Sequence, residues 1–318
     1  MRAALVTDYA RAPVEQEFPT PVRQQGQMLV DVVASAIHPR VRSQADGSHY
    51  TSTDELPLIP GIDGVGTDAE GRLRYFILPD TNRGAMAEQT AIDPRRSVLL
   101  PDGIDPVTIA AAMNPAMSSW IALRRRIEFQ PGMRVLIMGA TGNAGRFAVQ
   151  IARRLGASHV TAAGRDAERL SALTSLGADA IVELGGDPEQ IEHGLAAAGR
   201  TVDVVLDYLW GAPAASALRA IVPAREDDDR PLTWIQIGSI AGYDAPIPSA
   251  ALRATKLRIL GSGQGSVSPK EILTELPELA REVSTGGYDI AARAVPLHQV
   301  TEAWAESATT TDRLVLIP

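Results

Sequence analysis

The chain of 318 residues contains no cysteine, which excludes disulfide bonds, cysteine-ligated zinc, iron–sulfur clusters and thiol catalysis within it. It lacks any run of the roughly 18–20 apolar residues that a membrane-spanning helix needs. Its first residues, MRAALVTDYA, are not arranged like a signal peptide. Basic residues are outnumbered 30 to 38, and a net charge of −8 argues against nucleic-acid binding. We therefore expect a cytoplasmic enzyme or binding protein with neither a membrane nor a nucleic acid as partner.

Two kinds of sequence texture alternate along the chain. The first hundred residues are rich in proline, glycine and short β-branched runs, with strands expected at 28–33 and 74–78, and they predict a mostly β domain. From about Ile109, alanine-rich helical patterns alternate with short apolar strands, which is typical of a parallel sheet covered by helices. Six strands are expected there, at 134–138, 159–163, 180–183, 202–207, 233–237 and 257–260. This number and spacing predict a doubly wound α/β fold, whereas the strand expected at 314–317 should return to the first domain.

A glycine-rich segment directly follows the first of these six strands. It consists of Gly139, Ala140, Thr141, Gly142, Asn143, Ala144 and Gly145. An amphipathic helix follows, so that glycines can bring the backbone close to a pyrophosphate whose charge is met by N–H groups at the helix N-terminus. The G-x-x-G-x-x-G spacing differs from the usual G-x-G-x-x-G, and an ordinary strand–turn–helix corner is the alternative. The five strands downstream favour a dinucleotide-binding loop.

Several segments resemble the medium-chain dehydrogenase/reductase superfamily, and most closely its zinc-free quinone oxidoreductase branch. The similar segments are the glycine-rich loop, QIARRLGA at 150–157, LGAD at 176–179, LIPGIDGVG at 58–66, GAMAE at 84–88, PLHQV at 296–300, EAW at 302–304 and RLVL at 313–316. They occur in the family's order along nearly the whole chain. The resemblance implies a GroES-like catalytic domain formed by residues 1–115 and 262–318. Inserted into it, a Rossmann-type dinucleotide-binding domain is expected at 116–261.

The resemblance also bears on metal content. Zinc-dependent members of the superfamily ligate the metal at three positions that correspond here to His38, Ile62 and about Asn114. Isoleucine cannot ligate zinc, and catalytic zinc needs three protein ligands, so we expect no metal site. Without a Lewis acid, the remaining chemistry is hydride delivery to an activated acceptor such as a quinone or an enone, where hydrogen-bond donors suffice for the developing enolate.

Two candidate catalytic residues lie in the first domain. His38 stands where the zinc-free branch usually has asparagine, in an altered N-P-x-D segment that ends here in Val41. It could hold or protonate the substrate oxygen, or be a hydrogen-bonded loop histidine. Tyr50 lies in a G-S-H-Y segment similar to one whose tyrosine borders the substrate, with simple packing as the alternative.

Further candidates lie around the expected sheet. Ser118 takes the place of a threonine that sits beside the nicotinamide in the family, and we count it as both catalytic and cofactor-binding. Asn114 lies one helical turn earlier on the same face. Gly238 and Ser239 follow the fifth strand of the sheet, at the carboxyl end where such folds bind ligands.

The end of the second strand predicts NADP(H) rather than NAD(H). NAD-binding proteins carry an acidic residue there for the ribose 2′-hydroxyl, and the resemblance puts Gly164 at that position. Arg165 beside it can pair with a 2′-phosphate, although a solvated surface charge is the alternative. Asp166 is expected to cap the next helix; otherwise it becomes the ribose ligand.

These features predict an NADPH-dependent oxidoreductase that delivers hydride to a quinone or an α,β-unsaturated carbonyl without a metal. We expect a homodimer that acts on a small molecule. The alternative is an NADP(H)-binding redox sensor or partner-binding protein with little turnover, which the altered segment at His38–Val41 motivates.

Overall fold

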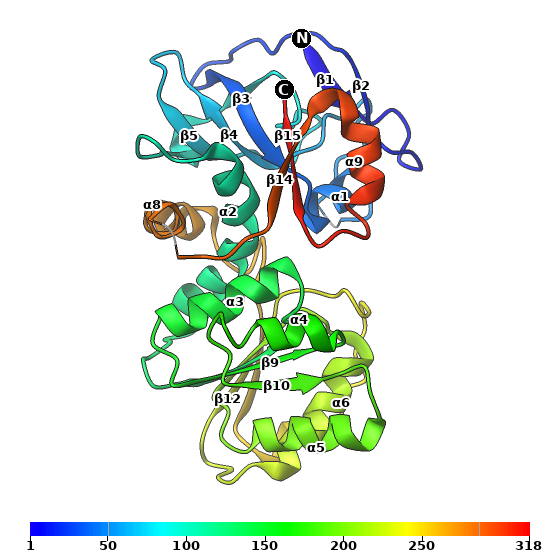
Figure 1. Ribbon diagram of the computed structural model, residues 1–318, viewed down its shortest axis with the longest axis vertical. Coiled ribbons are helices and arrows are strands. Elements are labelled where there is room, and N and C mark those ends of the chain that lie inside the picture. Colours follow the sequence, from blue (N-terminus) through cyan, green and yellow to red (C-terminus); the bar gives the residue numbers. More distant parts are fainter. Residues whose placement is uncertain (50, 286) are drawn as a thin grey trace. The chain divides into compact units, whose positions relative to one another are not determined.

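A computed structural model describes residues 1–49, 51–285 and 287–318, which divide into two compact units (Figure 1). Unit 1 comprises Met1–Asn114 and Leu273–Pro318, and unit 2 comprises Pro115–Ile272. The two boundaries between the units fall inside helices, after Asn114 in α2 (Pro106–Ile121) and after Ile272 in α8 (Pro269–Ser284). None of the helices in the described ranges is long and apolar enough to cross a membrane.

Unit 2 is built on a six-stranded parallel sheet. Its strands are β8 (Arg134–Met138), β9 (His159–Gly164), β10 (Ala180–Glu183), β11 (Val204–Asp207), β12 (Leu232–Gln236) and β13 (Leu257–Gly261). They lie in the order β10-β9-β8-β11-β12-β13 and all pair in parallel. This is the strand order of a doubly wound dinucleotide-binding sheet. From β8 the chain adds strands first on one side, β9 and β10, and then on the other, from β11 onward, so the strand order reverses between the neighbours β8 and β11. The predicted doubly wound α/β fold is therefore confirmed.

Helices follow the strands of unit 2. They are α3 (Asn143–Arg154), α4 (Ala167–Ala172), α5 (Pro188–Gly199), α6 (Gly211–Ile221) and the short α7 (Ala251–Ala254). Figure 1 shows α3 and α4 on one side of β9 and β10, with α5 and α6 on the other. Because helices cover both faces, the central strand β8 is apolar along most of its length, with Val135 and Met138 both buried. Phe147 and Ile151, one turn apart on α3, are buried as the helical pattern predicted.

Unit 1 is mostly β, as expected. The strands of its larger sheet lie in the order β14 (Ala292–Pro296), β15 (Arg313–Ile317), β3 (Met28–Ala36), β4 (Asp63–Thr67), β5 (Leu73–Ile77) and β7 (Ser97–Leu99). A further strand, β6 (Gln89–Ile92), also pairs with β3, and β1 (Arg2–Leu5) forms a separate two-stranded sheet with β2 (Val14–Glu17). The C-terminal strand β15 lies between β14 and β3, which confirms the predicted return to the first domain. Two short helices, α9 (Val300–Glu306) and α1 (Pro39–Ala45), contribute to its apolar core, and neither was predicted from the sequence.

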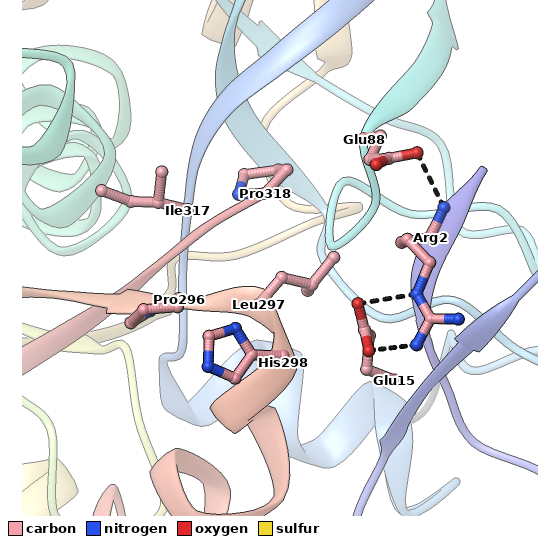
Figure 2. Close-up of a pocket in the computed structure, with 8 residues that line it drawn as sticks. All are labelled: Arg2, Glu15, Glu88, Pro296, Leu297, His298, Ile317 and Pro318. Carbon is pink, nitrogen blue, oxygen red and sulfur yellow. Dashed lines mark hydrogen bonds and ion pairs between the residues drawn. The ribbon is translucent and has the colours of Figure 1, made fainter.

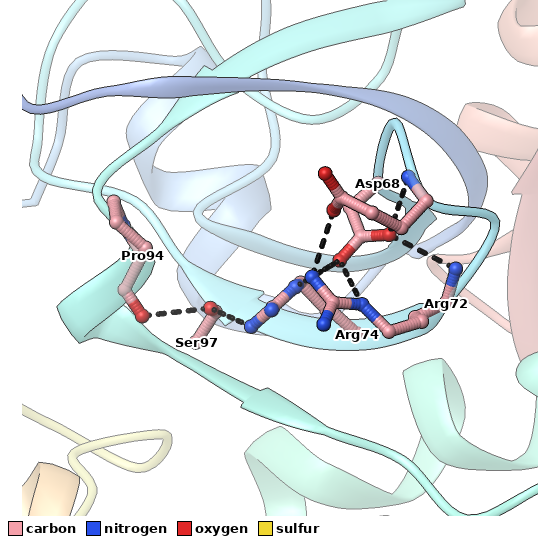
Figure 3. A network of polar contacts seen from close by, with 6 residues as sticks. Asp68, Arg72, Arg74, Pro94 and Ser97 are labelled. Carbon is pink, nitrogen blue, oxygen red and sulfur yellow. Dashed lines mark hydrogen bonds and ion pairs between the residues drawn. The ribbon is translucent and has the colours of Figure 1, made fainter.

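A buried carboxylate fixes the turn between β4 and β5 (Figure 3). The side chain of Asp68 is inaccessible to solvent and accepts hydrogen bonds from the backbone N–H of Arg72 at 2.9 Å and from Nε of Arg74 at 2.8 Å. Arg74 also donates to Ser97 Oγ at 3.2 Å, and Ser97 donates to the carbonyl of Pro94 at 2.8 Å. Burial by itself would raise the pKa of Asp68, but the hydrogen bonds from Arg74 and Arg72 outweigh it and hold that pKa well below its usual range.

Candidate cofactor and active site

The glycine-rich loop has the backbone geometry that a phosphate-binding turn needs. Gly139 has φ of +85°, a conformation that favours glycine. A Cβ on Gly145 would lie 2.4 Å from the carbonyl oxygen of Gly139, so only glycine lets the first turn of α3 pack this closely on the loop. The turn at Gly139 is the one that the sequence predicted, whereas the close packing at Gly145 also fits the alternative of an ordinary strand–turn–helix corner.

The start of α3 is open toward a ligand. Gly142 is its N-cap, and no side chain caps it. A Cβ on Gly142 would meet only the carbonyl oxygen of Gly139, at an ordinary 3.7 Å, so neither crowding nor its φ of −79° demands glycine here. The missing side chain instead leaves space in front of the first N–H groups of a twelve-residue helix. That space and those donors fit a pyrophosphate.

The end of β9 brings a basic group to the same edge of the sheet. Gly164 is the last residue of β9 and is buried, whereas Arg165 is exposed. Asp166 is the N-cap of α4, as predicted, and its carboxylate accepts the N–H of Arg169 at 3.0 Å and pairs with Nε of Arg169 at 3.1 Å. The acidic side chain is therefore engaged in the cap, and no hydrogen bond or ion pair of Arg165 occurs among the described residues.

The turn after β11 lies beside the glycine-rich loop after β8, at the place where the strand order of the sheet reverses. Asp207 is fully buried, and its Oδ1 accepts the N–H of Leu209 at 2.8 Å and of Trp210 at 3.0 Å. Its Oδ2 accepts the indole N–H of Trp234 at 2.9 Å. Burial raises the pKa of Asp207, although these three hydrogen bonds act in the opposite direction. Trp210 has φ of +53°, a conformation that costs a non-glycine residue about 1–3 kcal/mol and that occurs mainly at functional sites.

Ser118 is linked to this turn. Its Oγ donates to the carbonyl oxygen of Pro115 at 2.7 Å and lies 3.0 Å from the hydroxyl of Tyr208. Because Ser118 donates to Pro115, the hydroxyl of Tyr208 is left to donate to Ser118. Burial raises the pKa of Tyr208 to about 12, so the phenol stays protonated at neutral pH. Tyr208 was not predicted as a site residue from the sequence. The signal that could have indicated it is its position directly after β11, at the carboxyl end of a strand next to β8, where such folds bind ligands.

The segment after β12 supports the same turn. Gly238 donates its N–H to the carbonyl oxygen of Asp207 at 3.1 Å, and a Cβ on Gly238 would lie 2.8 Å from the carbonyl oxygen of Tyr208. Glycine at 238 therefore permits close approach of this backbone to Tyr208. Ser239 follows it and is partly exposed.

His38 lies in a buried polar cluster of unit 1. The histidine is 1% exposed, and its Nε2 lies 3.0 Å from Oδ1 of Asp63, whose Oδ2 accepts the hydroxyl of Tyr75 at 2.7 Å. Burial lowers the pKa of His38 despite the neighbouring carboxylate, so the imidazole is neutral near pH 7. The neighbouring Arg313 is also buried, which lowers its pKa to about 10, and it donates to the carbonyl oxygen of Ile37 at 2.9 Å.

The remaining predicted residues fall in different places. Asn114 lies in α2, partly exposed, and Ile62 is buried in the apolar core of unit 1. Tyr50 lies outside the described residues. Among the residues described, no three His, Asp or Glu side chains are grouped so that they could hold a metal ion.

A small cavity of about 180 Å³ lies in unit 1 near the two chain ends (Figure 2). Its lining residues are Arg2, Glu15, Glu88, Pro296, Leu297, His298, Ile317 and Pro318. The Arg2 guanidinium is already paired with Glu15, through Nε at 2.8 Å, and the backbone N–H of Arg2 donates to Glu88 at 2.8 Å. The cavity is smaller than the roughly 300–1,000 Å³ typical of small-molecule sites, and none of the candidate site residues lines it.

Comparison with known proteins adds the family. Residues 144–281 match the family model described as "Zinc-binding dehydrogenase", a range that excludes His38, Ile62 and Asn114. The chain is 31% identical to "Probable NADPH-dependent quinone reductase tdiC" of Emericella nidulans over an alignment of 362 residues that covers all of both proteins. It is 27% identical over 202 residues to the chloroplastic "NADPH-dependent alkenal/one oxidoreductase" of Arabidopsis thaliana, a match that covers 58% of this chain and 52% of that protein.

A solved structure agrees in fold. The quinone oxidoreductase of Thermus thermophilus, crystallised also as a complex with NADPH, superposes over the full length of both chains with a TM-score of 0.79 at 24% identity. The sheet order, the glycine-rich loop and the full-length relationship to the Emericella protein agree with one another. The chain belongs to the quinone oxidoreductase-like branch of the medium-chain dehydrogenase/reductase superfamily.

Proposed function

We propose that this protein is an NADPH-dependent oxidoreductase that reduces a quinone or an α,β-unsaturated carbonyl without a metal. The observation that carries the proposal is the edge of the unit 2 sheet. There the uncapped N-terminus of α3 lies beside Gly139 and Gly145, and β9 ends in Gly164 followed by the exposed cation of Arg165. The names of the two relatives, an NADPH-dependent quinone reductase and an NADPH-dependent alkenal/one oxidoreductase, support the same cofactor and substrate class.

Each part of the site has a separate task in this proposal. Residues 139–145 hold the pyrophosphate through backbone N–H groups, and bound NADPH supplies the hydride. We assign Ser118 and Tyr208 to the hydroxyl pair that orients the reacting groups. To stabilise developing negative charge on the acceptor oxygen, Ser118 would exchange its hydrogen bond to the Pro115 carbonyl oxygen for one to the acceptor, while Tyr208 keeps donating to Ser118. Asn114, Gly238 and Ser239 complete the proposed cofactor contacts.

His38 and Tyr50 both stay in the proposed catalytic site, His38 as a positioning residue and Tyr50 as a hydrogen-bond donor. A neutral, buried imidazole bonded to Asp63 is poorly placed to give a proton to a substrate. We therefore assign the imidazole of His38 to fixing Asp63. At the start of α1, of which His38 is the N-cap residue, only its backbone takes part, since its carbonyl oxygen accepts the N–H of Arg42 at 3.0 Å. Tyr50 is proposed as a donor to the substrate on the strength of its sequence segment alone.

The test is steady-state oxidation of NADPH with a panel of quinones, enones and aldehydes, followed by the loss of NADPH absorbance. We expect turnover with at least one quinone or enone and none with simple ketones, which need a stronger electrophilic catalyst. Tight binding of NADPH without turnover on any member of the panel would favour the redox-sensor alternative.

We further propose a cytoplasmic homodimer in which units 1 and 2 act as the GroES-like and the dinucleotide-binding domain. The strand β13 supports the dimer, since it lies at one end of the sheet order and every one of its residues is at least partly exposed. An unpaired strand edge of this kind can pair with a second copy. Light scattering after size exclusion should give twice the chain mass of 33.8 kDa, and subcellular fractionation tests the location.

A further inference from the structure

We propose that Thr141 makes the cofactor site selective for NADPH, because its side chain fills the space that an acidic ligand for the ribose 2′-hydroxyl needs and leaves its own hydroxyl to the 2′-phosphate. This inference rests on the proposed function and concerns the same site. It gives Thr141 a role distinct from that of the other loop residues, which meet the pyrophosphate through their backbone.

The first observation is a close contact between the loop and the end of β9. A Cβ built on Gly164 would lie 2.8 Å from Cγ2 and 3.1 Å from Oγ1 of Thr141, and 3.4 Å from Cδ2 of Leu170. Both branches of the threonine therefore face the position from which an acidic side chain would start. Even alanine at 164 is crowded there, and aspartate would have to place three further heavy atoms beyond that Cβ.

The second observation is that neither partner in this contact can move away easily. Gly139 and Ala140 both donate their N–H groups to the carbonyl oxygen of Ala163 at 2.9 Å, which ties the loop to β9 directly before Thr141. On the other side, the carbonyl oxygen of Gly164 accepts the N–H of Leu184 at 2.6 Å. The threonine is also β-branched, so few side-chain rotamers are open to it.

The third observation concerns charge and hydrogen bonding. Thr141 is partly exposed, and its hydroxyl has no hydrogen bond within the described ranges. Arg165 offers an exposed cation one residue after Gly164, while the carboxylate of Asp166 is engaged with Arg169. On β9 and directly after it, where doubly wound proteins bind the ribose 2′ group, the loop hydroxyl and the cation of Arg165 are thus available and the acid that follows them is engaged in the cap. The exposed Glu183 belongs to the neighbouring strand β10, paired in register with Gly164. The combination of hydroxyl and cation suits a phosphate dianion and not a neutral hydroxyl.

The hydroxyl is tested by equilibrium titration of the protein with NADPH and with NADH, followed by cofactor fluorescence, which needs no turnover. Thr141→Val keeps the shape of the side chain and removes the hydroxyl. Loss of one hydrogen bond to a charged group should weaken NADPH binding about ten- to one-hundred-fold and leave NADH within about twofold. Thr141→Ser keeps the hydroxyl and should stay within a few-fold of the wild type for both cofactors.

The steric part is tested by Gly164→Asp with and without Thr141→Ala. Gly164→Asp alone should weaken both cofactors, because the new side chain displaces Thr141 and with it the loop. Thr141→Ala/Gly164→Asp should bind NADH at least about tenfold more tightly than Gly164→Asp alone, a coupling expected only of residues in contact. Gly186→Asp is the matched control: it adds the same carboxylate to a nearby loop where a Cβ would meet nothing within 4 Å, and NADH binding should not change. Circular dichroism confirms folding, and if Gly164→Asp fails to fold, rescue of folding by Thr141→Ala is itself the expected coupling.

The outcomes separate this inference from the proposed function. A wild type that prefers NADH, or binds neither cofactor, contradicts the function proposed above. The role of Thr141 is overturned, and the function stands, if the wild type prefers NADPH but Thr141→Val does not change its NADPH affinity and Gly164→Asp binds NADH equally well with and without Thr141→Ala.

Discussion

The carboxylate of Asp207 organises the turn that carries Tyr208 and Trp210, and its substitution gives a prediction that can be worked out from three hydrogen bonds. In Asp207→Asn, the remaining carbonyl oxygen can still accept the two backbone N–H groups of Leu209 and Trp210. The new NH₂ group then faces the indole N–H of Trp234, which is 0% exposed, so that two donors meet and neither is satisfied. The opposite side-chain orientation would lose two hydrogen bonds instead of one.

One unsatisfied buried donor costs about 1–3 kcal/mol. Removal of the buried charge of Asp207, whose pKa is raised by burial, offsets part of this cost, and we expect a net loss of about 1–2 kcal/mol. Since folded domains are stable by only about 5–15 kcal/mol, such a change is measurable. Equilibrium urea unfolding followed by circular dichroism, fitted with one transition for each unit, measures it.

A double-mutant cycle isolates the hydrogen bond from other effects of the substitution. Trp234→Phe removes the indole N–H together with part of a buried ring. Because Asp207→Asn/Trp234→Phe no longer contains the opposed donors, it should cost less than the sum of the single variants by about 1–2 kcal/mol. The exposed Asp244→Asn is the matched control and should change the free energy of unfolding by less than about 0.5 kcal/mol. Additive costs within about 0.5 kcal/mol would refute the geometry argued for this turn.

Three further predictions concern the cofactor, the metal and the hairpin of unit 1. Arg165→Ala should weaken NADPH binding by about 1.5–3 kcal/mol in calorimetric titration and leave NADH unchanged; an equal loss for both cofactors would mean that Arg165 does not contact the 2′-phosphate. The purified protein should keep full activity after dialysis against a chelator, and one tightly bound zinc per chain in elemental analysis would contradict this. Because the folded-state pKa of Asp68 is lowered, its contribution to stability is present above about pH 4 and is lost as the pH falls toward that lower pKa. Asp68→Asn should therefore unfold more easily at pH 7 and show a flatter decline in stability below about pH 4, and parallel pH profiles would exclude Asp68 as the cause.

The fold of unit 2 could be predicted strand by strand because its signals are local, whereas in unit 1 only the strands at 28–33, 74–78 and 314–317 were expected. Each parallel strand is a short apolar run bounded by helices. The expected strands 134–138 and 180–183 coincide with β8 and β10, and the other four differ from the observed strands by one or two residues at one or both ends. The cap role of Asp166 was equally readable, because a helix cap depends on residues three positions apart. The short helices α1 and α9 were not, since seven residues hold too little periodicity to indicate a helix.

The contacts that shape the candidate site could not be predicted, because each joins residues distant in the chain. Ser118 and Tyr208 are 90 positions apart, and Asp207 and Trp234 are 27 apart. Gly164 could be identified as the residue at the end of the second strand. That its missing side chain leaves room for Thr141 depends on how the loop after β8 folds over β9, which no pattern in the sequence encodes.

The surroundings of Ile62 explain why a zinc-ligating side chain at that position would not fit the fold as it stands. Nε2 of His38 is hydrogen-bonded to Asp63, which is held in turn by the hydroxyl of Tyr75. Ile62, at the second ligand position, is 6% exposed and is part of the apolar core of unit 1. A ligating side chain at 62 would therefore have to leave that core. Zinc at Nε2 of His38 would have to break the bond to Asp63, whereas Nδ1 is buried without a hydrogen-bond partner among the described residues, and a ligand there would leave that bond intact. The obstacle to a metal site is thus the apolar core around Ile62 and not the polar cluster around His38.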